Sequence, residues 1–272
     1  MQTSRTLRFV MMCSTATACK ADPDNRPAVI ELTVLKGRPI ATGVYLNARG
    51  PFRFLFDTGA QTNQVDVAVA QQLGLSPTFR TELATVAGAR VVPGTRVGEV
   101  RLGSARATDQ EFLLTDLSGV HTLSSDVQGV LGQEFLAHFD YLIDLKSRTL
   151  IFGPRAPAGD HIPTGRIDGR LTLVTNVGNL VLDSGTDTLV LFRAGTSTTP
   201  ASSRIRTANG SATVRSGSGL RIQIAGRDFR TNSFLIAPWS DASEDGILPL
   251  GVFRAVYVSN SGGYIVANPP AN

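Results

Sequence analysis

The chain of 272 residues carries the same short acidic sequence twice, once in each half. Residues 54–60 read Phe-Leu-Phe-Asp-Thr-Gly-Ala, and residues 180–186 read Leu-Val-Leu-Asp-Ser-Gly-Thr. In each copy an apolar run typical of a buried strand ends in a tripeptide typical of a turn. One such tripeptide arises easily by chance, but two copies behind two similar strands predict a β unit that is used twice.

The similarity continues beyond the two acidic sequences. An apolar-apolar-Gly run follows the first at 130–132, and Leu-Pro-Leu-Gly follows the second at 248–251. Each run leads into a predicted hairpin, formed by 141–145 with 149–152 in the first half and by 256–258 with 264–266 in the second. The sequence therefore predicts two related β-rich units in tandem.

The composition agrees with a globular, turn-rich β protein. The chain has 27 glycines, and 42% of its residues are hydrophobic while 18% are charged. Two short helices are expected: 67–73, which has Asp66 as a cap and Gly74 as a stop, and 133–139. We therefore expect an all-β fold with a few short helices.

The Pro- and Gly-rich stretch 153–159 predicts a linker between the two units. The expected domains are a leader or tail at 1–27, a first lobe at 28–155 and a second lobe at 160–270.

Asp57 and Asp183 are the acidic residues that occupy matched positions of the repeat. Two carboxyl groups held close together cannot both ionise, so one keeps a proton while the other acts as a base. Such a pair can activate water for amide hydrolysis without a metal or cofactor. The sequence thus predicts Asp57 and Asp183 as the catalytic pair, with no fixed acid or base between them.

The neighbours of the two aspartates have expected roles in supporting the pair. Gly59 and Gly185 would let the two backbones approach each other closely. Thr58 and Ser184 would bond across the junction and hold the two loops together.

Thr186 introduces an expected difference between the halves. Its hydroxyl either donates to Asp183 and stabilises the charged form or is a plain turn hydroxyl, whereas Ala60 offers Asp57 no such hydroxyl. From this we expect activity to be highest at mildly acidic to neutral pH.

Two further predicted hairpins lie at matched places, at 85–92 and 207–214. They are either ordinary surface hairpins or flaps over a cleft. As flaps they would supply substrate-binding residues, namely Val86, Ala87, Gly88, Asn209 and Gly210.

These motifs resemble those of the aspartic peptidases, specifically the retropepsin-like branch found in bacterial proteins, with two such units fused. The matching residues are 56–60, 129–132 and 182–186, and the resemblance spans about 28–269. It implies a bilobal, pseudo-twofold barrel fold with one catalytic aspartate in each lobe. It also implies aspartic endopeptidase activity on a polypeptide substrate. Neither flap has the tyrosine of pepsin-like enzymes, which favours the retroviral type.

Other interpretations stay open. The two aspartates could be plain turn residues. The chain could be a non-catalytic peptide-binding module that keeps the cleft. Each lobe could pair with a lobe of another chain, although a short linker favours pairing within one chain and hence a monomer.

Other chemistries lack sequence support. Arginines are scattered without basic clusters, so we expect no nucleic-acid partner. The three histidines lack the spacing of metal ligands, so we expect no metal.

The leader resembles a short export signal. It has Arg5 and Arg8, an apolar run at 9–12 and the small residues 16–18. We therefore expect a periplasmic, secreted or lipid-anchored protein, or a cytoplasmic one if the leader is not a signal. A lipidated Cys19 would be the route to membrane anchoring.

Overall fold

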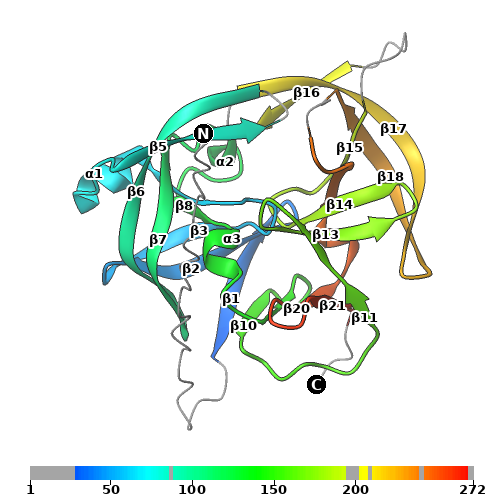
Figure 1. Ribbon diagram of the computed structural model, residues 1–272, viewed down its shortest axis with the longest axis horizontal. Coiled ribbons are helices and arrows are strands. Elements are labelled where there is room, and N and C mark those ends of the chain that lie inside the picture. Colours follow the sequence, from blue (N-terminus) through cyan, green and yellow to red (C-terminus); the bar gives the residue numbers. More distant parts are fainter. Residues whose placement is uncertain (1–27, 86–87, 194–201, 208–209, 239–241, 269–272) are drawn as a thin grey trace, which may run out of the picture.

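The computed structural model describes residues 28–85, 88–193, 202–207, 210–238 and 242–268. The predicted leader at 1–27 lies outside the described residues. The described part is all-β, as predicted, and its strands form curled sheets (Figure 1). Its helices are short: α1 (Val67–Leu73), α2 (Ser118–His121) and α3 (Gln133–Leu136).

We call the part of the chain from β1 to β10 the first half. Its strands are β1 (Val29–Leu35), β2 (Arg38–Leu46), β3 (Arg49–Phe56), β4 (Asn63–Asp66), β5 (Phe79–Thr85), β6 (Gly88–Leu102), β7 (Ala105–Thr115), β8 (Gly129–Leu131), β9 (Tyr141–Asp144) and β10 (Thr149–Phe152). Eight of them follow one another across the sheet in the order β1-β2-β3-β8-β4-β7-β6-β5.

The part from β11 to β21 is the second half. Its strands are β11 (His161–Pro163), β12 (Gly165–Ile167), β13 (Arg170–Thr175), β14 (Gly178–Asp183), β15 (Leu189–Phe192), β16 (Ser202–Thr207), β17 (Gly210–Ile224), β18 (Arg227–Ala237), β19 (Gly246–Pro249), β20 (Ala255–Ser259) and β21 (Tyr264–Ala267). Eight of them lie in the order β12-β13-β14-β19-β15-β18-β17-β16, which repeats the order of the first half strand for strand.

Six strands join the halves into one body. They run β11-β21-β20-β9-β10-β1, and the central pair, β9 and β20, brings Leu142 of the first half opposite Tyr257 of the second. In Figure 1 the first half lies on the left, the second on the right, and these strands lie below them. The predicted hairpins at 141–152 and 256–266 form the middle of this bridge.

The largest hydrophobic cluster draws residues from both halves. In the first half it is rich in aromatic rings, and Phe56 packs edge-on against Tyr141 with ring centroids 5.3 Å apart. Both rings are fully buried, and burial of an apolar side chain such as that of Phe56 stabilises the fold by roughly 1.5–3 kcal/mol. Phe56 and Leu182, which directly precede the two aspartates, are both fully buried, so the core fixes the strand ends from which the aspartates project.

The helix predicted at 67–73 is confirmed. Asp66 caps it by accepting a hydrogen bond from the amide of Ala68 at 2.8 Å, and Gly74 ends it in the left-handed conformation. The helix predicted at 133–139 is shorter than expected, and α3 ends at Leu136. The side-chain amide of Asn260 donates to the carbonyl oxygens of Leu136 and Phe139, and thus replaces helical partners.

The match of Gly251 with Gly132 is wrong. β8 and β19 lie beside β3 and β14 in the same register, so Leu131 corresponds to Leu248 and Gly132 corresponds to Pro249. A Cβ on Gly132 would lie 2.8 Å from the carbonyl oxygens of Ala60 and Thr62, whereas a Cβ on Gly251 would meet nothing within 4 Å. The second half therefore has no glycine at this close approach.

Within the described residues, no helix is long and apolar enough to cross a membrane.

Candidate active site

Asp57 and Asp183 stand at the ends of matched strands. Asp57 directly follows β3, and Asp183 is the last residue of β14. Each of these strands lies beside a parallel partner, β8 or β19, and the amide of Asp57 donates to the carbonyl of Leu131 at 2.9 Å. The two strand ends meet, and the structure brings the two carboxyl groups into hydrogen-bonding contact.

Thr58 and Ser184 join the two loops through four buried hydrogen bonds. The amide of Thr58 donates to Ser184 Oγ, and the amide of Ser184 donates to Thr58 Oγ1, both at 3.0 Å. Thr58 Oγ1 in turn donates to the carbonyl of Leu182 at 2.7 Å, and Ser184 Oγ donates to that of Phe56 at 2.6 Å. Each hydroxyl thus takes one donor and one acceptor from the opposite half.

Glycine is required where the loops meet. A Cβ on Gly59 would lie 2.5 Å from Asp183 Oδ2, and a Cβ on Gly185 would lie 2.5 Å from Asp57 Cγ. Any side chain at either position would push the opposite carboxyl group away. The two glycines therefore permit the carboxyl groups to approach.

The two carboxylates differ in their backbone donors. Asp57 Oδ1 accepts from the amides of Gly59 at 2.9 Å and Ala60 at 3.1 Å. Asp183 Oδ1 accepts from the amide of Gly185 at 2.6 Å. Since amide donors stabilise the charged form, this arrangement favours the negative charge on Asp57.

Of the two roles considered for Thr186, the donor to Asp183 is wrong and the turn hydroxyl is what the structure shows. Its hydroxyl donates to the carbonyl of Thr188 and accepts from the amide of Thr188, both at 3.3 Å, so it is engaged within its own turn. The expected asymmetry is consequently reversed, because Ala60 supplies its backbone amide to Asp57 while Thr186 gives Asp183 no hydroxyl.

Burial is the largest cause that raises the pKa of both carboxyl groups. For Asp183, the charge of Asp57 and the hydrogen bond between them raise the pKa further, well above its ordinary value of 3.8. For Asp57, the bond from Asp183 and the two amides oppose the effect of burial. The pair therefore holds a proton to higher pH than a free aspartate, with Asp183 as its favoured carrier.

Two residues near the pair were missed by sequence reasoning. Arg38 donates from Nε to the carbonyl of Gly185 at 2.9 Å, and Gln133 donates from Nε2 to the carbonyl of Thr58 at 2.8 Å. Arg38 and the loop that it contacts lie in different halves, so no local sequence pattern predicts this contact. Gln133 does have a signal, because it follows the Gly132 motif directly.

The two predicted flap hairpins are present as hairpins. β5 pairs with β6 up to Thr85 and Gly88, and β16 pairs with β17 up to Thr207 and Gly210. Both lie along the upper edge of Figure 1. Of the predicted substrate-binding residues, Gly88 and Gly210 open β6 and β17, while Val86, Ala87 and Asn209 lie outside the described residues. Their role in binding stays a prediction.

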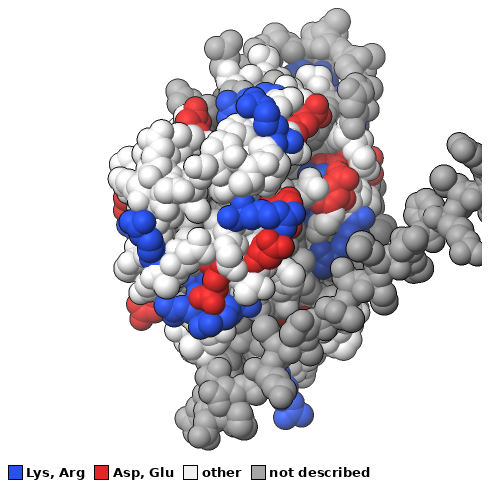
Figure 2. Space-filling view, turned by 60° about the vertical axis from the view of Figure 1, so that its left-hand side comes forward, with Lys and Arg blue, Asp and Glu red and all other residues white. Residues whose placement is uncertain are grey.

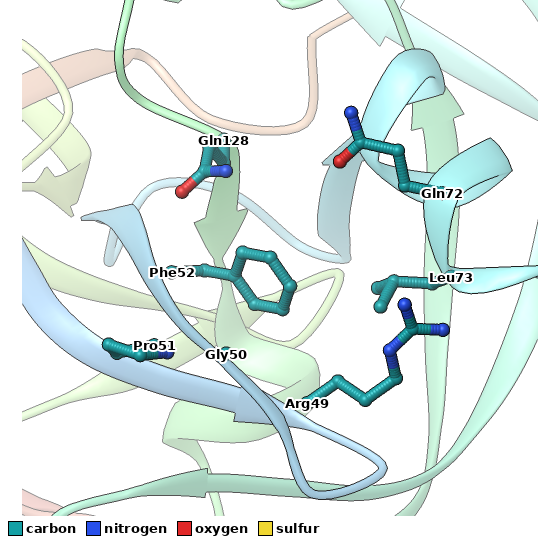
Figure 3. Close-up of a pocket in the computed structure, with 7 residues that line it drawn as sticks. All are labelled: Arg49, Gly50, Pro51, Phe52, Gln72, Leu73 and Gln128. Atoms are coloured by element: carbon teal, nitrogen blue, oxygen red, sulfur yellow. The ribbon is translucent and has the colours of Figure 1, made fainter.

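A cavity of about 380 Å³ lies elsewhere, on the first half (Figure 3). It lies between the start of β3, where the Phe52 ring faces it, the end of α1 at Leu73, and Gln128. None of the predicted site residues lines it.

The surface charges of the described residues are mixed. On the face shown in Figure 2, basic and acidic side chains lie next to one another. Among the described residues, Arg96 pairs with Asp109 at 2.9 Å and with Glu111 at 2.6 Å. No three His, Cys, Asp or Glu side chains in the described part of the chain gather as metal ligands.

Part of the first half is similar to a known family. Residues 42–135 match a family model described as aspartyl protease. This segment contains Asp57, Thr58, Gly59 and Gly132, while Asp183 lies outside it. Among curated proteins, none matches the chain. The family match supports a protease-type function and, for the first half, the predicted resemblance to aspartic proteases.

Proposed function

We propose that the chain is an aspartic endopeptidase that hydrolyses peptide bonds with a water molecule activated between Asp57 and Asp183. The observation that carries this proposal is the junction of the two loops. There, two carboxyl groups with raised pKa touch each other, and four buried hydrogen bonds hold the loops that carry them. The family match of residues 42–135 supports it independently.

The asymmetry of donors suggests the starting protonation of the pair. Asp57, with two amide donors, is ionised and acts as the base, while Asp183 is protonated and acts as the acid. The water oxygen attacks the carbonyl carbon of the substrate. One water proton passes to Asp57, and the proton of Asp183 passes to the carbonyl oxygen. This forms a neutral tetrahedral intermediate with two hydroxyl groups.

Collapse of the intermediate restores the pair. The proton on Asp57 moves to the amide nitrogen, and the C–N bond breaks with its electron pair on that nitrogen. One hydroxyl proton of the intermediate returns to Asp183 as the C=O bond of the new carboxyl group forms. The products are one carboxylic acid and one amine, and the pair again holds one proton.

The test is cleavage of a mixed peptide library between pH 3 and 8. Wild type should cut, and Asp57→Asn and Asp183→Asn should each lose at least about 10³-fold in kcat/KM, since each loses a proton-transfer group. Asp109→Asn is the control, because Asp109 is an exposed carboxylate paired with Arg96 at the surface. Circular dichroism should show all variants folded. Loss of cutting with only one of the two substitutions would contradict a shared pair.

The peptide-binding alternative has its own readout. If wild type does not cut but binds library peptides, and the two Asn variants bind equally well, the chain is a binding module. A polypeptide substrate, a monomeric working unit and export through the leader are further proposals. Light scattering in solution tests the monomer, and fractionation of expressing cells tests export.

A further inference from the structure

Arg38 reaches from the first half to the loop that carries Asp183. Its Nε donates to the carbonyl of Gly185 at 2.9 Å, and its Nη2 pairs with Asp187 at 3.1 Å. The Arg38 side chain is 20% exposed and that of Asp187 is 42% exposed, so within this ion pair the arginine is the more buried partner. A side chain of one half thereby fixes the backbone immediately after the aspartate of the other.

The second half carries an arginine at the matched position. Ile40 lies opposite Leu55, two residues before Asp57, and Thr172 lies opposite Val181, two residues before Asp183. Arg38 stands two positions before Ile40, and Arg170 stands two positions before Thr172. The fold therefore places the two arginines at equivalent positions.

Arg170 does not make the equivalent contact. It forms two hydrogen bonds to Glu244, at 2.8 and 3.1 Å, within its own half. The Glu244 side chain is 2% exposed, so it is a buried carboxylate that requires a cation beside it.

The residue that corresponds to Glu244 explains the difference. Gly246 and Gly129 occupy the same register position beside β14 and β3, so Glu244 corresponds to Val127. Val127 is buried among apolar side chains and cannot hold a guanidinium. Arg38 is therefore left available to cross the junction, while Arg170 is retained by Glu244. Gln61, which corresponds to Asp187, also offers no negative charge to Arg170.

We propose that Arg38 is a positioning residue for the candidate active site: it orients the Asp183 loop through Gly185 and keeps one positive charge beside the carboxyl pair. This rests on the proposed function. Among the described residues, the charged groups found to act on the pair are the two carboxyls themselves and Arg38 on β2, with Asp187 on the Asp183 loop as the counterion of Arg38. The cation lowers the pKa of both aspartates and so opposes the larger effect of burial.

Two substitutions separate the charge of Arg38 from its hydrogen bond. Arg38→Gln keeps a donor for the Gly185 carbonyl without the charge, and Arg38→Lys keeps the charge without the planar fork. Arg38→Met removes both. The matched control is the double variant Arg170→Met with Glu244→Met, which removes the equivalent arginine without leaving a buried charge unpaired.

The pH profile of kcat/KM gives the first readout. Arg38→Met and Arg38→Gln should move both limbs to higher pH by on the order of one unit, because a nearby cation is lost. Arg38→Lys should leave the limbs in place. Arg38→Met should also lower the maximum about tenfold, and Gln should recover part of this loss. Superimposable profiles for wild type and Arg38→Gln, or an equal shift in the double control, would overturn the proposal.

A second readout needs no turnover. The unfolding free energy of each protein is compared with that of the same protein carrying Asp183→Asn, across pH. The pH range over which these two unfolding free energies diverge reports the titration of the carboxyl pair. Without the Arg38 cation, this range should extend to higher pH. If wild type fails to cleave any peptide, the proposed function is wrong, and this comparison still decides whether Arg38 acts on the pair. An unchanged range in Arg38→Gln contradicts the inference.

Discussion

Thr58 and Ser184 exchange equivalent hydrogen bonds across the junction between the halves, each amide donating to the other residue's hydroxyl at 3.0 Å. Both residues are essentially inaccessible to solvent. The loops that carry the two aspartates are therefore held by one another, and the position of each carboxyl group depends on both halves.

Removing one hydroxyl should loosen both loops. Thr58→Val keeps the shape of the side chain but leaves the carbonyl of Leu182 and the amide of Ser184 without their partner. We expect the free energy of unfolding to fall by about 2–4 kcal/mol, because two buried polar groups lose their hydrogen bonds. Urea denaturation measures it. Thr58→Ser, which keeps the hydroxyl and loses only the methyl group, is the control and should retain most of the stability; an equal loss in Thr58→Ser would contradict the assignment of the effect to the hydroxyl.

Gly132 and Gly251 should respond differently to alanine. A methyl group on Gly132 would lie 2.8 Å from two carbonyl oxygens, whereas one on Gly251 would meet nothing. Gly132→Ala should lower the free energy of unfolding by about 1–3 kcal/mol through overpacking. Gly251→Ala should change it by less than about 0.5 kcal/mol, as expected for an open surface site. Thermal and urea unfolding of the two variants side by side check this, and a larger effect at Gly251 would refute the register match with Pro249.

The raised pKa of Asp183 has a consequence for stability. In the folded state the carboxyl group stays protonated above 3.8, whereas in the unfolded chain it ionises near that value. The contribution of the group is fully present below pH 3.8 and is lost as pH rises through the folded pKa. Asp183→Asn does not ionise, so it should be more stable than wild type at pH 7, and the difference should shrink toward pH 3.

Guanidinium denaturation at pH 3, 5 and 7 measures this difference. Asp109→Asn, at the exposed surface, serves as the control and should show no such trend. A constant difference between Asp183→Asn and wild type at all three pH values contradicts the prediction.

The rate of cleavage should depend on pH as a bell. The working pair holds one proton, so activity falls at low pH when both carboxyls are protonated and at high pH when both are ionised. Burial raises the pKa of both, which places the acidic limb above pH 3.8. The optimum is thus expected at mildly acidic to neutral pH, for a different reason than a hydroxyl from Thr186. A maximum near pH 2 rules this out.

Much of the fold could be predicted because the relevant signals are local. The strand before each aspartate, the hairpins at 141–152 and 256–266 and helix α1 with its cap and stop all have residue patterns that short-range geometry dictates. The repeat then implies that two such units face each other. The boundaries of the predicted domains, the leader and the monomer stay predictions.

The details that sequence reasoning missed are those that depend on the opposite half or on register. Arg38 contacts Gly185, which lies 147 positions further along the chain, so the residues next to Arg38 in the sequence do not indicate its partner. Thr186 has a hydroxyl three positions after Asp183 in the sequence, but the turn directs it toward Thr188. Gly251 completes the apolar-apolar-Gly motif in the sequence, but the strand register places Pro249 at the position that corresponds to Gly132.

Because the first half has Val127 where the second half has Glu244, the two halves are not equivalent at the junction. A symmetric protein built from two copies of the second half would hold both arginines away from the junction, on their own buried glutamates. One built from two copies of the first half would have two arginines free to cross, and at each crossing it would meet Gln61 instead of Asp187. Only the fused chain contains both the unretained arginine, Arg38, and its ion-pair partner, Asp187. A dimer of two identical halves would therefore lack this ion pair across the junction.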